Sequence, residues 1–373
     1  MDSRPARTGI WRHAARLPAR TPQSAVTLGE GDTPLVRLHR WGARYGLRRV
    51  YAKLEFANPT GSYKDRGMAV LVQLAVEAGA RHLVEDSSGN AGAAAAAYAA
   101  RAGMTCTVYA PAAAPEAKLR QIRAYGAELV LVPGPRAAVA DAARQAGATP
   151  GAYHVSHNDN PAFVPGNKTF AYELAEAYRN GEFQEWPSVG PVGEDGDPSS
   201  TERVTSSGEQ SSAWHVVIPT GGGALFCGAW HGFLEERELG GLDSAILPRL
   251  HAAQTVACAP LAQAFAAGMT EPAIVERRPS VCGGIEIERP ARGREILAAI
   301  HQSGGTATAS EEVAILEERD RLALLEGIYA EPTSAAAFAA LAQLAREGYV
   351  GADEIVVVAV TGSGLKDPGP DRS

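Results

Sequence analysis

Apolar and polar positions along the first half of the chain alternate between short β-branched runs and longer helical patterns. After a strand at 50–55, glycine-punctuated helices and short strands follow each other up to residue 155. Such alternation builds βαβ units and therefore predicts a parallel sheet covered by helices. The expected helices span 67–79, 92–103, 114–125 and 136–146, and the expected strands span 82–85, 105–109, 128–131 and 153–155.

The same alternation returns in the second half and ends in a strand made only of apolar residues. Residues 355–360 contain no polar side chain, which is typical of a strand buried on both faces of a parallel sheet. This strand leads directly to Thr361, at the edge where open α/β sheets bind ligands. The other expected elements are helices at 170–178, 225–236, 262–267, 292–301, 311–326 and 334–347, and strands at 214–218 and 255–257.

A polar stretch at 187–212 interrupts this pattern. Gly, Pro, Ser, Thr and Glu dominate it, and large apolar residues are almost absent. The stretch cannot bury enough apolar surface to offset the entropy lost on ordering, so we expect a disordered insertion. A tolerated insertion explains it better than a regulatory or partner-binding segment. Residues 1–7 are also expected to be disordered, ahead of a short anchoring helix or turn at 9–13.

Composition and charge narrow the class of function. The chain has 373 residues, of which 45% are hydrophobic, and this suffices for two packed lobes with a full core. A net charge of −7, without a basic run of five residues, argues against nucleic acid or a membrane surface as partner. No apolar run reaches the length of a membrane span or resembles the core of a signal peptide. We therefore expect a cytoplasmic protein that acts on a small molecule.

The cysteines predict neither a metal site nor a disulfide framework. Cys106, Cys227, Cys258 and Cys282 show no Cys-x-x-Cys spacing and no nearby histidine in ligand spacing. Small core residues in a reducing compartment are the favoured interpretation.

The candidate chemistry begins with Lys64, in the segment 58–67, which reads Asn-Pro-Thr-Gly-Ser-Tyr-Lys-Asp-Arg-Gly. Asn-Pro-Thr-Gly is strong turn chemistry, so the lysine should lie just before a helix that begins near Gly67. The positive end of the helix dipole lowers the cost of a neutral amine and favours attack on an aldehyde. Taken alone, the segment also fits an ordinary surface lysine beside Asp65 and Arg66.

Two further segments join the end of an expected strand to the start of an expected helix. In the first, the backbone N–H groups of the Gly-Gly-Gly-Ala-Leu stretch at 221–225 can converge on a phosphate. A tight turn for helix packing is the alternative. In the second, Asn90 ends a Ser-Ser-Gly-Asn stretch, whose residue types also fit a helix N-cap.

Four segments, in this order, resemble the threonine synthase family. They are the decapeptide at 58–67, Ser-Ser-Gly-Asn-Ala-Gly at 87–92, Pro-Thr-Gly-Gly-Gly at 219–223 and Thr-Gly-Ser-Gly-Leu-Lys-Asp at 361–367. The ordered set is specific, whereas any one segment would be weak. The family belongs to the fold-type-II enzymes that depend on pyridoxal phosphate (PLP), together with threonine dehydratases and O-acetylserine sulfhydrylases.

The resemblance implies a two-lobed α/β fold that binds PLP between the lobes. Each lobe would hold an open, twisted, mostly parallel sheet flanked by helices. A small mobile lobe would comprise 67–159, and a large PLP-binding lobe would comprise 28–66 and 160–373, after an N-terminal segment at 1–27. The resemblance further implies an amino-acid substrate and a homodimer.

The resemblance also assigns roles within the site. Lys64 would form the Schiff base with the cofactor aldehyde and then move protons as base and acid. Asn90 would hydrogen-bond the phenolic oxygen, and the Thr361 hydroxyl would face the pyridine nitrogen, where a neutral partner suits elimination and replacement better than transamination. The other assignments are Gly221, Gly222, Gly223, Ala224 and Leu225 for the cofactor phosphate, and Ser87, Ser88, Ala91, Glu286 and Glu331 for the substrate.

Three positions depart from the family pattern. Threonine synthases usually carry an arginine where this chain has Phe163, and an aromatic ring cannot replace its grip on a substrate phosphate. Ala91 replaces a threonine, and Glu286 stands where a further arginine is common. A carboxylate facing the substrate would favour an amine or hydroxyl and repel a phosphate.

Three functions remain open on the sequence. The first is a threonine-synthase-like lyase that acts on O-phosphohomoserine or a related activated amino acid. The second keeps the fold but acts as a serine or threonine dehydratase, or as a β-replacement enzyme of a specialised pathway, as the three departures suggest. The third is a non-catalytic, regulatory PLP-binding protein, against which the intact Lys64 and cofactor segments argue.

Overall fold

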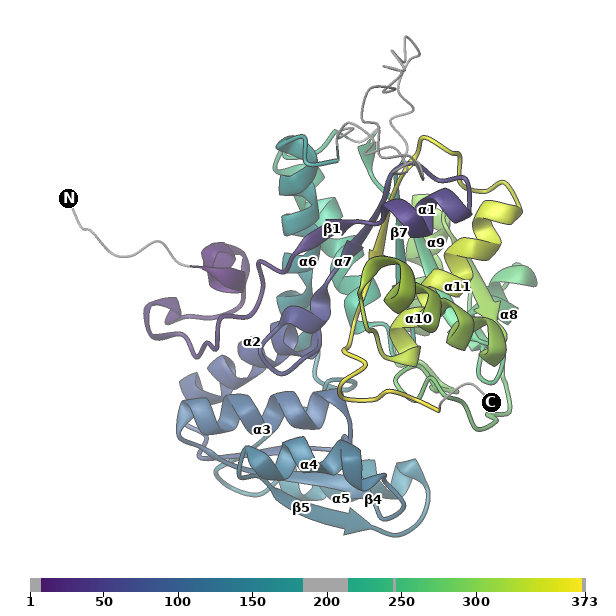
Figure 1. Cartoon of the computed structure of the whole chain (residues 1–373). Coiled ribbons are helices and arrows are strands. Elements are labelled where there is room, and N and C mark those ends of the chain that lie inside the picture. Colours follow the sequence, from purple (N-terminus) through teal and green to yellow (C-terminus); the bar gives the residue numbers. More distant parts are fainter. Residues whose placement is uncertain (1–7, 184–213, 244–245, 371–373) are drawn as a thin grey trace, which may run out of the picture.

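The computed structural model of the protein describes residues 8–183, 214–243 and 246–370. Its strands form two sheets. The smaller sheet has the order β5-β4-β3-β6 and is parallel throughout; its strands are β3 (His82–Glu85), β4 (Thr105–Pro111), β5 (Glu128–Val132) and β6 (Ala152–His154). Three helices connect them: α3 (Asn90–Ala102), α4 (Glu116–Ala124) and α5 (Arg136–Gly147). They form the lower part of the molecule in Figure 1.

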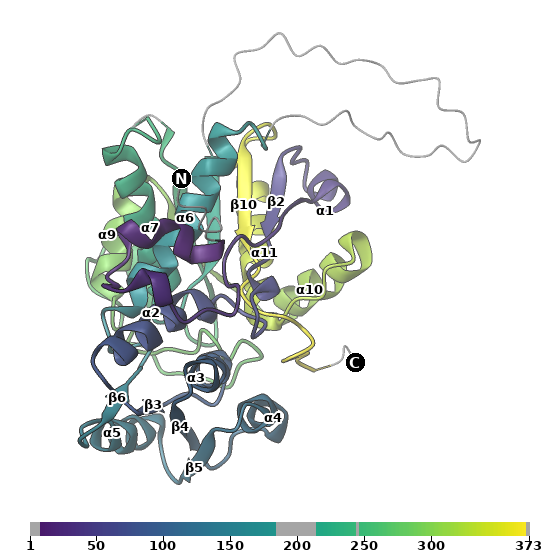
Figure 2. The ribbon, with the colours of Figure 1, turned by 90° about the vertical axis from the view of Figure 1, so that its left-hand side faces the viewer.

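The larger sheet has the order β1-β2-β10-β7-β8-β9, and only β1 is antiparallel to its neighbour. Its strands are β1 (Leu35–Arg37), β2 (Val50–Lys53), β7 (Trp214–Pro219), β8 (Arg249–Thr255), β9 (Thr306–Ser310) and β10 (Ile355–Ala359). Every residue of β10 is buried, and the strand lies between β2 and β7, as Figure 2 shows for β2. The α/β architecture with mostly parallel sheets is therefore confirmed.

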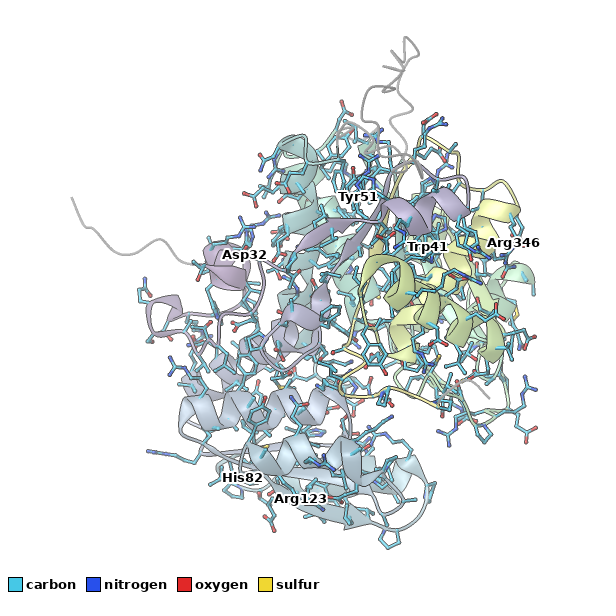
Figure 3. The ribbon with its side chains drawn as sticks, viewed as in Figure 1. Asp32, Trp41, Tyr51, His82, Arg123 and Arg346 are labelled. Atoms are coloured by element: carbon cyan, nitrogen blue, oxygen red, sulfur yellow. The ribbon has the colours of Figure 1, made fainter. Side chains whose placement is uncertain are left out.

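Helices cover both faces of the larger sheet. The α-helices outside the smaller sheet are α1 (His39–Arg44), α2 (Lys64–Glu77), α6 (Phe163–Arg179), α7 (Ala224–Glu238), α8 (Pro260–Ala266), α9 (Gly293–Ser303), α10 (Glu312–Glu326) and α11 (Pro332–Arg346). Short 3₁₀ segments add η1 (Gly9–Arg16), η2 (Pro22–Ser24) and η3 (Glu55–Ala57). Alternate residues of β10 pack against α6, α7 and α9 on one face and against α1, α10 and α11 on the other. Trp41 and Arg346 in Figure 3 lie in this larger part, whereas His82 and Arg123 lie in the smaller one.

Glycine and alanine allow the close contacts that shape the site. A Cβ atom on Gly166 of α6 would lie 2.1 Å from the carbonyl oxygen of Arg66, so α6 can approach the start of α2 only with glycine there. A Cβ on Gly92 would lie 1.9 Å from the carbonyl oxygen of Ser87, which holds the serine loop against α3. The rest of α3 is largely alanine, the strongest helix former, and its residues 91–99 are buried.

Several helices and strands begin or end at residues other than those predicted from the sequence. The helix expected from residue 67 begins at Lys64, and the helix expected at 170–178 begins at Phe163. The strand expected at 255–257 lies at Arg249–Thr255, and β1, α1 and β9 were not predicted. His251 and Gln254 broke the apolar pattern of β8, yet both are buried and hydrogen-bonded: His251 with His215 and Thr306, and Gln254 with α8.

Other expectations have mixed outcomes. All four cysteines are buried and free, as the sequence predicted. The short helix expected at 9–13 is part of η1. The disorder expected at 1–7 and 187–212 falls outside the described residues. Within the described part of the chain, no helix is long and apolar enough to span a lipid bilayer. The division into lobes at 67 and 160 stays a prediction.

A buried ion-pair network fixes the start of α2. The Arg66 side chain is inaccessible to solvent; its Nε donates to Glu55 Oε2 at 2.7 Å and its Nη1 to Glu173 Oε1 at 2.6 Å. Lys53 Nζ reaches the second oxygen of Glu173 at 2.7 Å. Burial alone would raise the pKa of Glu173, but the charges of Arg66 and Lys53 hold it well below its usual value. The network therefore ties β2, α2 and α6 together two residues from Lys64.

We predict that Arg66→Met lowers the free energy of unfolding by about 3–5 kcal/mol, because the buried carboxylate of Glu55 loses its pair with Arg66, and that of Glu173 loses one of its two cations and keeps Lys53. The measurement is urea denaturation at neutral pH. Arg48→Met is the matched control: it removes a pair with Asp353 in which both side chains are more than half exposed. Arg48→Met should lower the free energy of unfolding by less than about 1 kcal/mol. Equal costs for the two variants would contradict the proposed anchor.

Candidate active site

One cavity of about 830 Å³ lies where the two sheets approach each other. Its walls come from the carboxyl ends of strands in both sheets and from the loops that follow them, as expected for α/β proteins. Every residue that the sequence analysis placed at the site lines this cavity: Lys64, Ser87, Ser88, Asn90, Ala91, Gly221, Gly222, Gly223, Ala224, Leu225, Glu286, Glu331 and Thr361. Their individual roles stay predictions.

Lys64 is the first residue of α2, which begins three residues before the start that the sequence predicted, so the lysine lies in the first turn and not ahead of the helix. Its Nζ donates a hydrogen bond to the Tyr63 hydroxyl at 2.7 Å. The same nitrogen lies 5.8 Å from the centroid of the Phe163 ring. The backbone N–H of Tyr63 donates to the carbonyl of Thr361 at 3.1 Å, and Ser62 bridges to Gly362. The lysine segment and the Thr361 segment therefore form one wall.

The glycine-rich turn forms an anion cradle at the start of α7. Gly223 has a φ of 89°, a left-handed conformation that favours glycine, and α7 begins at the next residue. Among the described residues, no acceptor takes the backbone N–H groups of Gly221, Gly222 or Gly223. Free N–H groups at the positive end of a helix bind anions, and phosphate above all.

Arg292 starts beside this cradle but is not among the residues that line the cavity. Its Cβ lies 3.5 Å from the position that a Cβ on Gly223 would take. Its Nη1 is buried and has no hydrogen-bond partner in the described structure, which is costly for a guanidinium N–H. The fit to a phosphate, such as that of PLP, therefore rests on the backbone N–H groups of the cradle.

The residues assigned to the cofactor ring and to the substrate also line the cavity. Asn90, the first residue of α3, donates from Nδ2 to Glu331 Oε2 at 3.1 Å. Burial raises the pKa of Glu331, and the Asn90 amide opposes that shift. The Thr361 hydroxyl lies 3.1 Å from that of Ser334, and both residues are buried. The Ser87 hydroxyl accepts from the N–H of Gly89 at 3.3 Å, at the mouth of α3.

Glu286 lines the cavity, but its negative charge is partly compensated by an ion pair with Arg277. Its Oε2 lies 3.2 Å from Nη1 of Arg277, and its Oε1 accepts from the N–H of Ser280 at 3.0 Å. Burial raises the pKa of Glu286, while Arg277 lowers it. The repulsion of an anionic substrate that the sequence suggested is therefore weaker than for an unpaired carboxylate.

Phe163 is buried beneath the lysine and is absent from the cavity wall. Its exposed fraction is 0%, and its ring lies 2.6 Å from the position that a Cβ on Gly67 would take. Threonine synthases usually carry an arginine at this position. Here a buried aromatic ring packs beside Lys64 in its place.

Sequence reasoning missed a second group of polar residues on the smaller sheet. Asp86 and His157 line the cavity, and Glu85 lies behind them. Glu85 ends β3 and His157 follows β6, and these two strands are neighbours. The rule that ligands bind at the carboxyl ends of parallel strands would have pointed to both positions. Further residues that the sequence analysis did not assign line the same cavity, among them Arg136, Asn158 and Lys366.

Comparison with known proteins gives consistent matches. Residues 26–362 match the family described as "Pyridoxal-phosphate dependent enzyme". The chain is 33% identical over 361 residues to the threonine synthase of Methanocaldococcus jannaschii, covering 96% of this chain and 81% of that one. The L-serine ammonia-lyase of Rhizomucor miehei has a TM-score of 0.69 at 20% identity, covering 89% of this chain and 93% of that one. The threonine deaminase of T.th. has a TM-score of 0.67 at 23% identity, covering 91% and 94%.

These findings confirm the resemblance that the four sequence segments carry. They also confirm fold type II and PLP as the cofactor. The two solved structures are less than 25% identical to this chain and support the fold alone. The chain therefore belongs to the family of pyridoxal-phosphate dependent enzymes, and it is a PLP-dependent lyase related to threonine synthases.

Proposed function

We propose that the protein catalyses a threonine-synthase-like reaction, converting O-phosphohomoserine or a related activated amino acid to threonine or an analogue. The observation that carries the proposal is the 33% identity to a threonine synthase along nearly the whole chain, with Lys64 and the four cofactor segments meeting in one cavity. The proposal includes a homodimer that acts on a small-molecule substrate in the cytoplasm.

The residues around the cavity have different roles in the proposed reaction. PLP, when bound, supplies the electron sink that acidifies the Cα proton of an amino acid. Lys64 Nζ removes that proton and returns it, with the Tyr63 hydroxyl within hydrogen-bond distance. The Ser87 loop at the start of α3 holds the substrate carboxylate. Thr361 offers a neutral hydroxyl held by Ser334, which suits loss or exchange of a side-chain substituent.

A second candidate is a serine or threonine dehydratase, or a β-replacement enzyme of a specialised pathway. Phe163 favours it, because a fully buried ring beneath Lys64 cannot bind the phosphate of O-phosphohomoserine. Glu286 on the cavity wall adds a carboxylate that prefers a hydroxyl or amine to a phosphate.

We predict that Lys64→Ala and Lys64→Arg both lose turnover, by at least about 10³-fold, while the melting temperature stays near that of the wild type. Arginine keeps the positive charge beside Tyr63 but cannot serve as a neutral amine, so it is the matched control for charge. Activity and thermal melting are measured on the same PLP-loaded samples. An active Lys64→Arg enzyme would contradict the assigned role.

The substrate is tested by incubating the PLP-loaded enzyme with O-phosphohomoserine and following released phosphate together with the carbon product. We expect phosphate and threonine in equal amounts. The same assay with L-serine, L-threonine and O-acetyl-L-serine tests the second candidate. Turnover of one of these, with no phosphate released from O-phosphohomoserine, would reject the first candidate in favour of the second.

A further inference from the structure

A histidine–carboxyl pair faces the cavity from the smaller sheet. His157 Nδ1 lies 2.8 Å from Glu85 Oε1. The His157 side chain is 13% exposed, whereas Glu85 is inaccessible to solvent and its Oε2 has no partner among the described residues. His157 makes no other hydrogen bond within the described structure, so Nε2 is left for the cavity that the residue lines.

The pair lies close to Lys64. The ring of His157 meets the Phe163 ring edge-on, with centroids 6.1 Å apart, and Lys64 Nζ lies 5.8 Å from the centroid of that same ring. Lys64 also affects the pKa values of both His157 and Glu85, which places its charge within electrostatic range of the pair. Two proton-carrying groups therefore border one cavity, both beside the Phe163 ring.

Burial and neighbouring charges favour a neutral pair. Burial, then Asp86, raises the pKa of Glu85 well above its usual value, against Arg136 and Lys64. Burial, then Lys64, Arg136 and Arg292, holds the pKa of His157 well below its usual value. Glu85 in turn raises the pKa of Cys106, after burial, which is the larger cause. Both directions favour the arrangement in which Glu85 is a carboxylic acid that donates to Nδ1 and Nε2 of His157 carries a proton.

A cation site is the competing interpretation, because ligand atoms of Glu85, Asp86 and His157 lie within 4.8 Å of one another. Asp86 is already engaged, however: Arg136 Nη2 binds its Oδ2 at 2.7 Å, and the Ser156 hydroxyl lies 3.3 Å from its Oδ1. A cation would have to compete with Arg136 and would lie near Lys64. The local charges therefore favour a proton over a metal ion.

We propose that Glu85 and His157 form a proton relay that serves the oxygen atom on Cβ of the substrate. The inference rests on the proposed function, since both candidate reactions make or break a bond between Cβ and a hydroxyl oxygen. His157 is the catalytic residue that contacts this oxygen, and Glu85 is the positioning residue that supplies or accepts the proton behind it.

The relay balances in both directions. In dehydration, the Cβ–O bond breaks with its electron pair on oxygen, the Nε2 proton moves to that oxygen, and the Glu85 proton moves to Nδ1. Water leaves, and the pair remains as a carboxylate hydrogen-bonded to Nδ1–H until the proton that Lys64 took from Cα returns to Nε2 and restores it. In threonine formation, the pair first gives its Nε2 proton to the phosphate anion that has already left the substrate, and the Glu85 proton moves to Nδ1. Water then adds to Cβ, Nε2 accepts its proton, and Nδ1 returns a proton to Glu85. No oxidant or other co-reactant is required.

The test compares His157→Gln and Glu85→Gln with the wild type. Glutamine at position 85 can still donate a hydrogen bond to Nδ1 but has no acidic proton to transfer. The Glu85→Gln variant therefore distinguishes proton transfer by Glu85 from simple orientation of the His157 ring. His82→Gln is the control, because His82 lies on β3 of the same sheet and does not line the cavity. All variants are loaded with PLP, and their melting temperatures are recorded.

If L-serine or L-threonine is the substrate, both relay variants should lose about 10²-fold in dehydration. Elimination of chloride from 3-chloro-L-alanine needs no proton on the leaving group, so it should stay within about threefold of the wild type. If O-phosphohomoserine is the substrate, phosphate release should persist while threonine gives way to 2-oxobutyrate. Equal losses with both kinds of leaving group, or no loss at all, would overturn the relay.

A second measurement on the cofactor-free protein does not depend on any substrate. Nitrogen-15 NMR of the histidine rings, assigned with His157→Gln, should show His157 neutral at pH 7 with its proton on Nε2, in the wild type and in Glu85→Gln. An imidazolium, or a proton on Nδ1, would overturn the relay. A wild type that eliminates chloride but accepts none of the oxygen substrates would reject the proposed function, and the NMR result would still decide the resting state of the pair.

Activity that disappears with EDTA and returns with Mg²⁺ or Zn²⁺ would also overturn the relay, in favour of a cation held by Glu85, Asp86 and His157.

Discussion

The position of Lys64 depends on a buried charge two residues away. Arg66 is surrounded by protein and is satisfied only where Glu55, Glu173 and the neighbouring threonines meet. Because an unpaired buried charge is far costlier than a paired one, this arrangement allows a single placement of the first turn of α2. Gly166 lets α6 come close enough to complete it. The lysine is thus positioned by a network that has no part in the chemistry.

With Lys64 fixed, the two sheets contribute different parts of the site. The larger sheet supplies the glycine cradle after β7 and Thr361 after β10, to which we assign the phosphate and the pyridine nitrogen of PLP. The smaller sheet supplies the serine loop after β3 and His157 after β6, to which we assign the substrate carboxylate and its oxygen on Cβ. Both sets stand at the carboxyl ends of parallel strands, where backbone N–H groups and side chains converge.

The sequence predicted most of the framework and the cofactor end of the site. Glycine-punctuated alternation placed the strand at His82–Glu85 correctly, and the ordered segments around Lys64, Asn90, Gly221 and Thr361 proved to line one cavity.

The sequence analysis did not predict which polar residues are buried, or which residues far apart in the chain contact each other. The full extent of β8 was not predicted, because His251 and Gln254 resemble surface residues until their hydrogen-bond partners on other strands and helices are known. Glu85 and His157 escaped for the same reason, since they are 72 positions apart and meet only when β3 pairs with β6. The position of each residue near the end of a strand could have marked it as a candidate, but the contact between the two carries no local pattern in the sequence.

The roles assigned to all these residues require that PLP is joined to Lys64 in this cavity. The most direct measurement is reduction of the PLP-loaded protein with borohydride, followed by proteolysis and mass spectrometry of the labelled peptide. We expect the reduced pyridoxyl group on Lys64 alone, in the peptide that carries Ser62 and Tyr63. A label on Lys366 or elsewhere, or no stable label, would contradict the assignment of the active site.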